Sequence, residues 1–167
     1  MISINETTYS KDLANRKITV VREFDAPVEL VWRAWTEKEL LDQWWAPKPY
    51  QAKTKSMDFR EGGIWLYNME GPEGDAAFCR VDFEQIREHK FISSKDMFCD
   101  ERGNPNDDFP KMRWTNHFTP TESGTKVQVV VSFNSEADLE KIVEMGFQEG
   151  FAAAHGNLDE LLEKQLQ

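Results

Sequence analysis

The side chain best suited to acid–base chemistry in this sequence is His155, which lies on an apolar stripe near the C-terminus. Phe147, Phe151 and His155 recur every four residues, so a helix would place all three on one face. An imidazole there can orient a polar ligand or act as a weak general base. It can equally be a core histidine bonded to Asp159 one turn later, or to a buried water. The sequence leaves both readings open.

Further polar side chains could join His155, provided that the strands carrying them turn the right face inward. They are Tyr67, Arg80, Asn116 and, on the same predicted helix, Glu149. Which way they point depends on strand parity, because successive strand residues face opposite sides of a sheet. We therefore name no defined catalytic residue, and keep His155 as a weak candidate only.

The remaining histidines and the two cysteines indicate neither a metal site nor a catalytic nucleophile. His89 falls in a predicted hairpin turn and His117 lies opposite an apolar strand face, and neither has Cys, His or acidic neighbours at ligand spacing. Cys79 and Cys99 have no basic surroundings readable from the sequence that would favour a thiolate. We interpret them as two small buried hydrophobes rather than as a disulfide. No metal site and no cofactor are expected.

The aromatic residues, which include six Trp and eleven Phe, are the other conspicuous set. Aromatic residues that recur with the period of a strand or a helix can either fill a core or line a cavity, and their spacing does not distinguish the two. The paired Trp44-Trp45 before Pro47 is expected to close one end of the fold. The candidate ligand-binding residues are Trp35, Trp45, Trp65, Tyr67, Trp114, Phe118, Phe147, Phe151 and His155.

The spacing of apolar residues along the chain predicts the strands and helices that position these side chains. An alternating β-branched run over residues 18–24 predicts a strand, followed by a helix with Asp25 as N-cap and Pro27 in its first turn. A second short helix is expected over residues 37–45. The period of two that follows predicts strands at 52–59, 64–69, 78–86, 91–98, 112–118 and 126–133.

Helical spacing returns over residues 136–166, with Ser135 as the expected N-cap. Gly146 and Gly150 fall inside this predicted helix, where each costs about 0.5–1 kcal/mol relative to Ala. Close approach of the helix backbone to the sheet, or room for a ligand, would offset that cost. The order of elements predicts an α+β fold, an antiparallel sheet wrapped around the final helix.

Composition and charge narrow the classes of partner. The 167 residues carry thirty acidic and twenty basic side chains, a net charge of −10, with no dense basic stripe. Nucleic acid and anionic membrane surfaces would be repelled on average, so neither is an expected partner. The first residues have no secretion signal and no apolar stretch could span a bilayer, so a cytoplasmic location is expected.

Three segments together resemble one known family. They are Asp25–Thr36 continuing to Trp44-Trp45-Ala46-Pro47, Arg60–Trp65 continuing to the turn Gly71-Pro72-Glu73-Gly74, and Glu144–Phe151 continuing to Leu158–Leu162. In this order they resemble the Hsp90-ATPase-activator-homologue-1-like domains of the SRPBCC (START/Bet v 1-like) superfamily. The resemblance divides the chain into an N-terminal extension, residues 1–15, and a single domain, residues 16–167. His155 departs from the family pattern, which usually has an apolar residue there.

The resemblance implies a helix-grip fold, in which a curved seven-stranded antiparallel sheet closes around a long C-terminal helix. Two short helices after the first strand plug one end. Related proteins hold lipids, sterols, polyketides or other apolar small molecules in the cavity between sheet and helix. The co-chaperone that names the family engages Hsp90 through a separate N-terminal domain that these residues lack, so the resemblance argues against a co-chaperone function.

The function implied is therefore that of a small protein that binds a hydrophobic ligand, without a defined catalytic activity. Two alternatives remain open. One is a cyclase-, dehydratase- or hydrolase-like enzyme that works in the same cavity, and the other is a stress- or chaperone-associated interaction domain. The expected partner is a hydrophobic small molecule, and a homodimer is left open.

Overall fold

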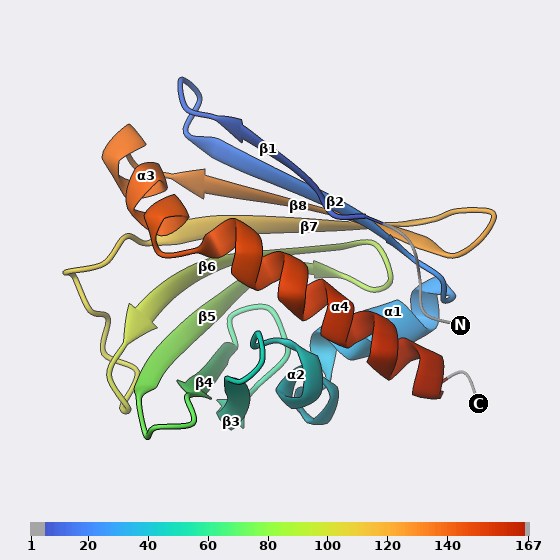
Figure 1. Ribbon diagram of the computed structural model, residues 1–167, viewed down its shortest axis with the longest axis horizontal. Helices are drawn as coiled ribbons and strands as arrows, with labels where there is room; N and C mark the ends of the chain where they lie inside the picture. Colours follow the sequence, from blue (N-terminus) through green and yellow to red (C-terminus); the bar gives the residue numbers. More distant parts are fainter. Residues whose placement is uncertain (1–5, 166–167) are drawn as a thin grey trace.

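One antiparallel sheet bends around a long helix in the computed structural model, which describes residues 6–165 (Figure 1). The strands lie in the order β1-β2-β8-β7-β6-β5-β4-β3. Their bounds are Thr8–Asp12 (β1), Lys17–Phe24 (β2), Gln51–Met57 (β3), Ile64–Glu70 (β4), Ala76–Arg87 (β5), Phe91–Cys99 (β6), Met112–Pro120 (β7) and Thr125–Phe133 (β8). The helices are Val28–Thr36 (α1), Lys38–Trp44 (α2), Glu136–Glu144 (α3) and Phe147–Gln165 (α4).

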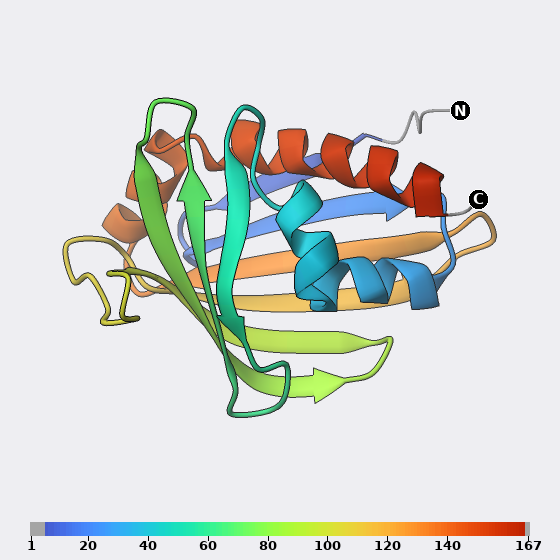
Figure 2. The same ribbon diagram turned by 90° about the horizontal axis from the view of Figure 1, so that it is seen from below.

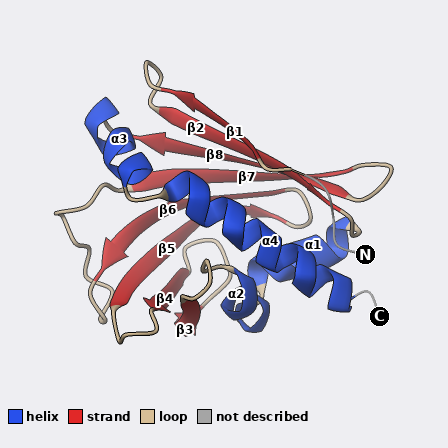
Figure 3. Ribbon diagram, viewed as in Figure 1, coloured by secondary structure: helices blue, strands red, loops and turns tan. Residues whose placement is uncertain are grey.

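All four helices lie on the concave side of the sheet (Figure 3). Seen from below, α4 runs across that side while α1 and α2 fill the space beside its C-terminal half (Figure 2). The predicted helix-grip architecture is therefore confirmed. No helix within residues 6–165 is both long enough and apolar enough to cross a membrane.

The sheet has one more strand than the seven predicted. The additional strand, β1, lies in the segment that the sequence assigned to an N-terminal extension, and pairs with β2 from Thr8↔Val21 to Asp12↔Lys17. Four of its five residues are exposed and only Tyr9 is half-buried. An exposed edge strand shows no alternation of apolar and polar residues, so the hydrophobic pattern could not reveal it.

The predicted start of the first helix was wrong by two residues. Pro27, with an extended backbone, is the N-cap of α1, and its carbonyl accepts hydrogen bonds from the N–H groups of Leu30 and Val31. Ser135 is the N-cap of α3 as predicted, because its hydroxyl accepts a 3.1 Å hydrogen bond from the N–H of Asp138.

The single C-terminal helix predicted over residues 136–166 is in fact two. Helix α3 ends at Glu144 and α4 begins at Phe147, with Gly146 between them at φ 91°. A glycine reaches that left-handed backbone conformation without steric cost, and such a residue commonly ends a helix. Gly146 is therefore a helix terminator, whereas Gly150 lies inside α4.

Several of the most completely buried side chains lie under the C-terminal half of α4. Leu158 and Ala154 of that helix are buried together with Trp44 of α2 and Val31 of α1. From the sheet, inward-facing residues near the Phe24 end of β2 and the Thr125 end of β8 complete this region: Val20, Phe24, Val127 and Val129. This half of the concave side is solid, which leaves the other half for a site.

Candidate functional site

A cavity of about 300 Å³ lies under the N-terminal half of α4, between the break in the C-terminal helices and strands β4 to β7. That volume is at the lower end of the roughly 300–1,000 Å³ of small-molecule sites. Its lining is mostly apolar: Trp45, Pro47, Tyr67, Met69, Cys79, Arg80, Val81, Asp96, Met97, Phe98, Met112, Trp114, Ile142, Met145, Gly146, Phe147, Gly150 and Phe151.

Aromatic rings from three different elements form one wall of this cavity. Trp114 of β7 lies 5.8 Å from Trp45, 5.9 Å from Phe147 and 5.6 Å from Phe151, measured between ring centroids. The inclined rings pack mostly edge to face, an arrangement that aromatic pairs favour. The wall therefore presents ring surfaces that are held in place by one another.

The polar lining is sparse and lies on the sheet. Tyr67 of β4 accepts a 2.8 Å hydrogen bond at its hydroxyl from the indole N–H of Trp45. Burial raises the pKa of Tyr67 well above its usual value, and burial raises the pKa of the neighbouring Cys79 to about 12. Both side chains are therefore neutral at physiological pH and act only as hydrogen-bonding groups.

Asp96 of β6 is the one acidic side chain in the lining. It opposes Val81 on β5 and Met112 on β7, and one carboxylate oxygen accepts a 2.5 Å hydrogen bond from the hydroxyl of Ser94. Burial raises the pKa of Asp96 to about 7, although the Ser94 hydroxyl opposes the rise. A carboxyl in such surroundings changes charge near neutral pH.

Sequence reasoning missed Asp96. The signal that could have found it is strand parity, because Ser94, Asp96 and Phe98 alternate along β6 and share one face. Their partners on β5, which are Phe83, Val81 and Cys79, are the inward-facing residues of that strand. A carboxylate in that register has to face the cavity.

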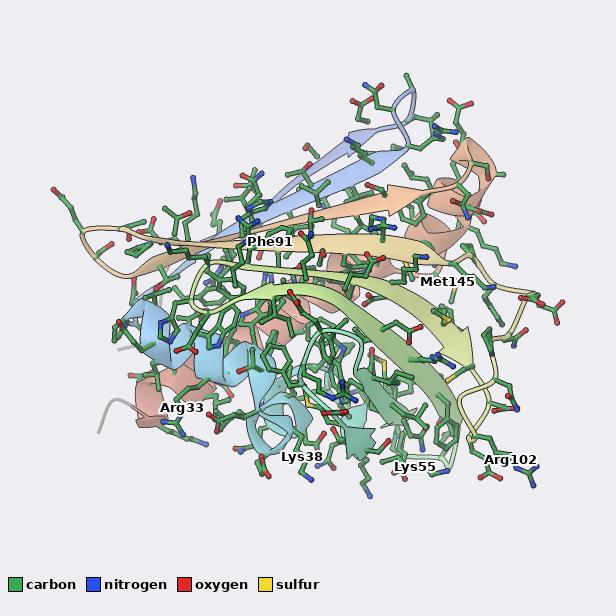
Figure 4. The ribbon with its side chains drawn as sticks, turned by 180° about the vertical axis from the view of Figure 1, so that it is seen from behind. Arg33, Lys38, Lys55, Phe91, Arg102 and Met145 are labelled. Atoms are coloured by element: carbon green, nitrogen blue, oxygen red, sulfur yellow. The ribbon has the colours of Figure 1, made fainter. Side chains whose placement is uncertain are left out.

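The mouth of the cavity lies at the break between α3 and α4. Met145, in the break, lines the cavity and is 49% exposed, and Figure 4 labels it beside the end of α3. Gly150, one turn into α4, lacks a side chain, and a Cβ built there would lie 3.7 Å from the Cγ of Pro47. That distance is an ordinary van der Waals contact, so α4 passes close to Pro47 at this border of the cavity.

Of the nine residues predicted to bind a ligand, five line the cavity: Trp45, Tyr67, Trp114, Phe147 and Phe151. Trp65, stacked on Tyr67 at 4.2 Å, lies behind the wall and donates a hydrogen bond to the hydroxyl of Thr54. Trp35 and Phe118 pack against each other at 5.7 Å in the solid half of the core. The remaining residue is His155.

His155 lies outside the cavity lining and is buried among aromatic rings. Its Nδ1 is 2.9 Å from the hydroxyl of Thr7, and its ring is 5.5 Å from Phe24 and 4.3 Å from Phe151. His155 is thus a buried core histidine, the second of the two readings, but its partner is Thr7, while the carboxylate of Asp159 pairs with Arg22. Burial, and to a smaller extent the charge of Arg22, lowers the pKa of His155 to about 3.

The pair of Arg22 and Asp159 is the buried charge cluster beside His155. One guanidinium nitrogen lies 3.0 Å from an oxygen of Asp159, and a second, closer contact makes the pair bidentate. Both side chains are 5–6% exposed. The pair joins β2 to α4 across the solid core and does not reach the cavity.

The other polar candidates divide between the cavity and its surroundings. Arg80 is in the lining, but its guanidinium is held by Asp82 at 2.6 Å and by the carbonyl of Gly103 at 2.9 Å. Asn116 is buried on β7 outside the lining, and Glu149 is exposed on α4. Tyr67 is thus the only one of the four with an uncharged polar group at the cavity.

The described residues offer neither a metal centre nor a disulfide. No group of three or more His, Cys, Asp or Glu side chains within residues 6–165 is placed to hold a metal ion. Cys79 and Cys99 are buried free thiols on β5 and β6.

Comparison with known proteins identifies one matching family and several solved structures with a similar fold. The family model described as Activator of Hsp90 ATPase homolog 1-like protein matches residues 25–163. Protein Ms6760 from Mycobacterium smegmatis is 31% identical, with a TM-score of 0.87 over 93% of this chain and 96% of its own. A protein from Arthrobacter aurescens is 32% identical, with a TM-score of 0.88 over 94% of this chain and 91% of its own. No curated protein matches the chain.

Proposed function

The chain belongs to the Activator of Hsp90 ATPase homolog 1-like family, and from that premise we propose that it binds a small hydrophobic molecule in the cavity beneath α4. Proteins of this fold commonly hold apolar ligands between sheet and helix. The ligand would come from the cytoplasm, the compartment expected from the sequence.

The observation that carries the proposal is the division of the concave side into two halves. Under the C-terminal half of α4, Leu158 and Trp44 are completely buried and the space is filled. Under its N-terminal half, Phe147 and Phe151 stand over about 300 Å³ of apolar space that Met145 borders at the surface. An apolar molecule that enters this space leaves water and gains contact with rings that are already positioned.

Two tryptophans in the lining make binding directly observable. Titration with the neutral fluorescent probe N-phenylnaphthylamine is expected to quench Trp45 and Trp114 and to saturate at one probe per chain. Native mass spectrometry of freshly purified protein would show the same stoichiometry for any retained compound.

A variant that fills the cavity tests the location. Met112→Trp adds bulk at a residue of the lining, and is expected to weaken probe binding at least about tenfold. Ile64→Trp, at a site 37% exposed outside the lining, is the matched control and keeps the native affinity. Absence of saturable binding to the native chain, or equal binding by the folded Met112→Trp variant, would refute the proposal.

A further inference from the structure

The charge of Asp96 has no cationic partner in the part of the chain that the structure describes. Its carboxylate accepts one hydrogen bond, from Ser94, and makes no ion pair with any residue from 6 to 165. The other charged side chain in the lining, Arg80, is already paired with Asp82 through two hydrogen bonds of 2.6 and 3.2 Å. Asp96 is therefore the one unpaired charge at the cavity.

The rest of the lining suits a positive charge with an apolar body. Aromatic faces attract cations through their ring quadrupoles, most strongly those of Trp, within about 6 Å of the ring centroid. Trp114 follows Met112, the cross-strand neighbour of Asp96, by two residues on the same face of β7. The wall of Trp114, Trp45, Phe147 and Phe151 thus lies on the same cavity as the carboxylate.

We propose that the ligand of this cavity is a hydrophobic organic ammonium ion, whose charged nitrogen pairs with Asp96 while its apolar rings or chain pack against the Trp45–Trp114 wall. This inference rests on the proposed function, since it names the chemical class of the molecule bound there. It also selects against anionic apolar molecules such as fatty acids, which would bring a second negative charge to Asp96.

Electrostatics supports this choice at short and long range. Burial leaves a charged Asp96 poorly solvated and, with the negative charge of Asp82, raises its pKa to about 7. A ligand ammonium would supply the missing countercharge and favour the ionised carboxylate. The net charge of −10 additionally attracts cations and repels anions at a distance.

Two ligands of nearly the same shape test the inference. Naphthylmethylamine is protonated at about pH 8, where Asp96 with its pKa of about 7 is ionised, and naphthylmethanol replaces the ammonium by a neutral hydroxyl. Calorimetric titration at that pH is expected to show the amine binding the native chain at least about tenfold more tightly than the alcohol.

Asp96→Asn removes the charge with little change of shape. In this variant the amine is expected to lose at least about tenfold in affinity, while the alcohol stays within about twofold. Asp107→Asn, at a side chain 85% exposed, changes the net charge equally and keeps the native preference for the amine. Because the alcohol binds the same cavity, it reports whether the Asp96→Asn variant is folded.

The pH dependence of binding to the native chain is an independent test. Lowering the pH from about 8 to about 6 protonates Asp96 and should weaken amine binding but not alcohol binding. The titratable side chains facing Asp96 from neighbouring strands are Tyr67 and Cys79, and their raised pKa values keep them neutral throughout. The negative charge of Asp82, which is paired with Arg80, also raises the pKa of Asp96.

Each outcome decides between the two proposals. Alcohol binding without a preference for the amine, or a preference that survives in Asp96→Asn, overturns the ammonium ligand and leaves the hydrophobic cavity standing. Failure of both compounds to bind the native chain overturns the cavity function and the ammonium ligand together.

Discussion

The indole N–H of Trp45 donates a 2.8 Å hydrogen bond to the hydroxyl of Tyr67, and this bond ties the end of α2 to β4 at the cavity wall. Trp45 is in contact with Trp35, Trp44, Trp65, Trp114 and Phe151, so its ring is the centre of the aromatic cluster. The bond fixes which way this ring faces. The cavity therefore has a wall whose position is set by a polar contact as well as by packing.

Removing the Tyr67 hydroxyl should show how much this hydrogen bond contributes to the free energy of unfolding. Tyr67→Phe leaves the Trp45 N–H without its partner, and is expected to lower the free energy of unfolding by about 1–3 kcal/mol. Tyr9→Phe is the matched control, because the Tyr9 hydroxyl is buried with no hydrogen-bond partner among the described residues. We expect that change to be neutral or slightly stabilising in urea unfolding. Equal losses in the two variants would contradict this account.

The two glycines of the C-terminal helices should respond oppositely to alanine. Gly146→Ala forces a side chain into φ 91° and should cost about 1–2 kcal/mol of unfolding free energy. Gly150→Ala adds a helix-favouring residue whose Cβ meets Pro47 at an ordinary 3.7 Å, and should gain about 0.5–1 kcal/mol. Chemical denaturation measures both. A gain at Gly146 would contradict its assignment as a helix terminator.

Neighbouring acids on α4 make ion pairs of unequal importance. Asp159→Ala leaves Arg22 charged and buried without its partner, and should cost about 3–5 kcal/mol. Glu160 pairs with Lys48 at 3.2 Å, with both side chains more than half exposed, so Glu160→Ala should change stability by less than about 1 kcal/mol. Comparable losses in urea unfolding would show that the Arg22 pair is solvated.

The carboxyl of Asp96 should make stability fall as the pH rises. Its folded pKa of about 7 exceeds the ordinary value of 3.8, so its protonated form contributes stability that is complete below about pH 4 and is lost as the pH rises through 7. The difference in stability between Asp96→Asn and the native chain should therefore grow with pH across this window, by at most about 1.4 kcal/mol per unit. Thermal melts from about pH 5 to pH 8 measure it, and parallel curves would contradict it.

His155 should act in the opposite direction. Its folded pKa of about 3 lies below the ordinary 6.5, so its neutral form contributes stability that is present above pH 6.5 and is lost as the pH falls towards 3. The groups packed around it are Thr7, Arg22, Phe24, Phe151 and Asp159. Between about pH 7 and pH 5 the native chain should lose about 2 kcal/mol relative to His155→Leu. Nuclear magnetic resonance should show no titration of His155 in that range, and a midpoint near 6.5 would contradict its burial.

Much of the fold was readable because half-buried strands alternate in composition. Strands β4 and β6 were placed within one residue of their true ends, since their apolar residues recur with a period of two. Gly146 and β1 were missed for physical reasons. A terminating glycine inside a continuous apolar stripe looks like any helical glycine, and the exposed β1 has no apolar face to recognise.

The site was less readable than the fold. Trp35 and Phe118 fill the core while Trp114 and Phe147 line the cavity, yet all four are aromatic residues at regular spacing. Composition cannot separate packing from lining, because both favour apolar rings. Asp96 lies between Lys95 and Met97 in a mixed run, so only the strand register shows that it faces inward.

Strand β1 also covers the edge of β2. Behind it lies β2, a β-branched strand whose backbone N–H and C=O groups would otherwise form an unpaired edge of the sheet, open to pairing with another chain. The outermost strand instead ends in the exposed, charged Lys11 and Asp12, and the far edge, β3, carries the exposed Lys53 and Lys55. A chain shortened to begin at residue 16 would expose the edge of β2 to edge-to-edge aggregation, and would also lose the contact of Tyr9 with Phe147 at the cavity.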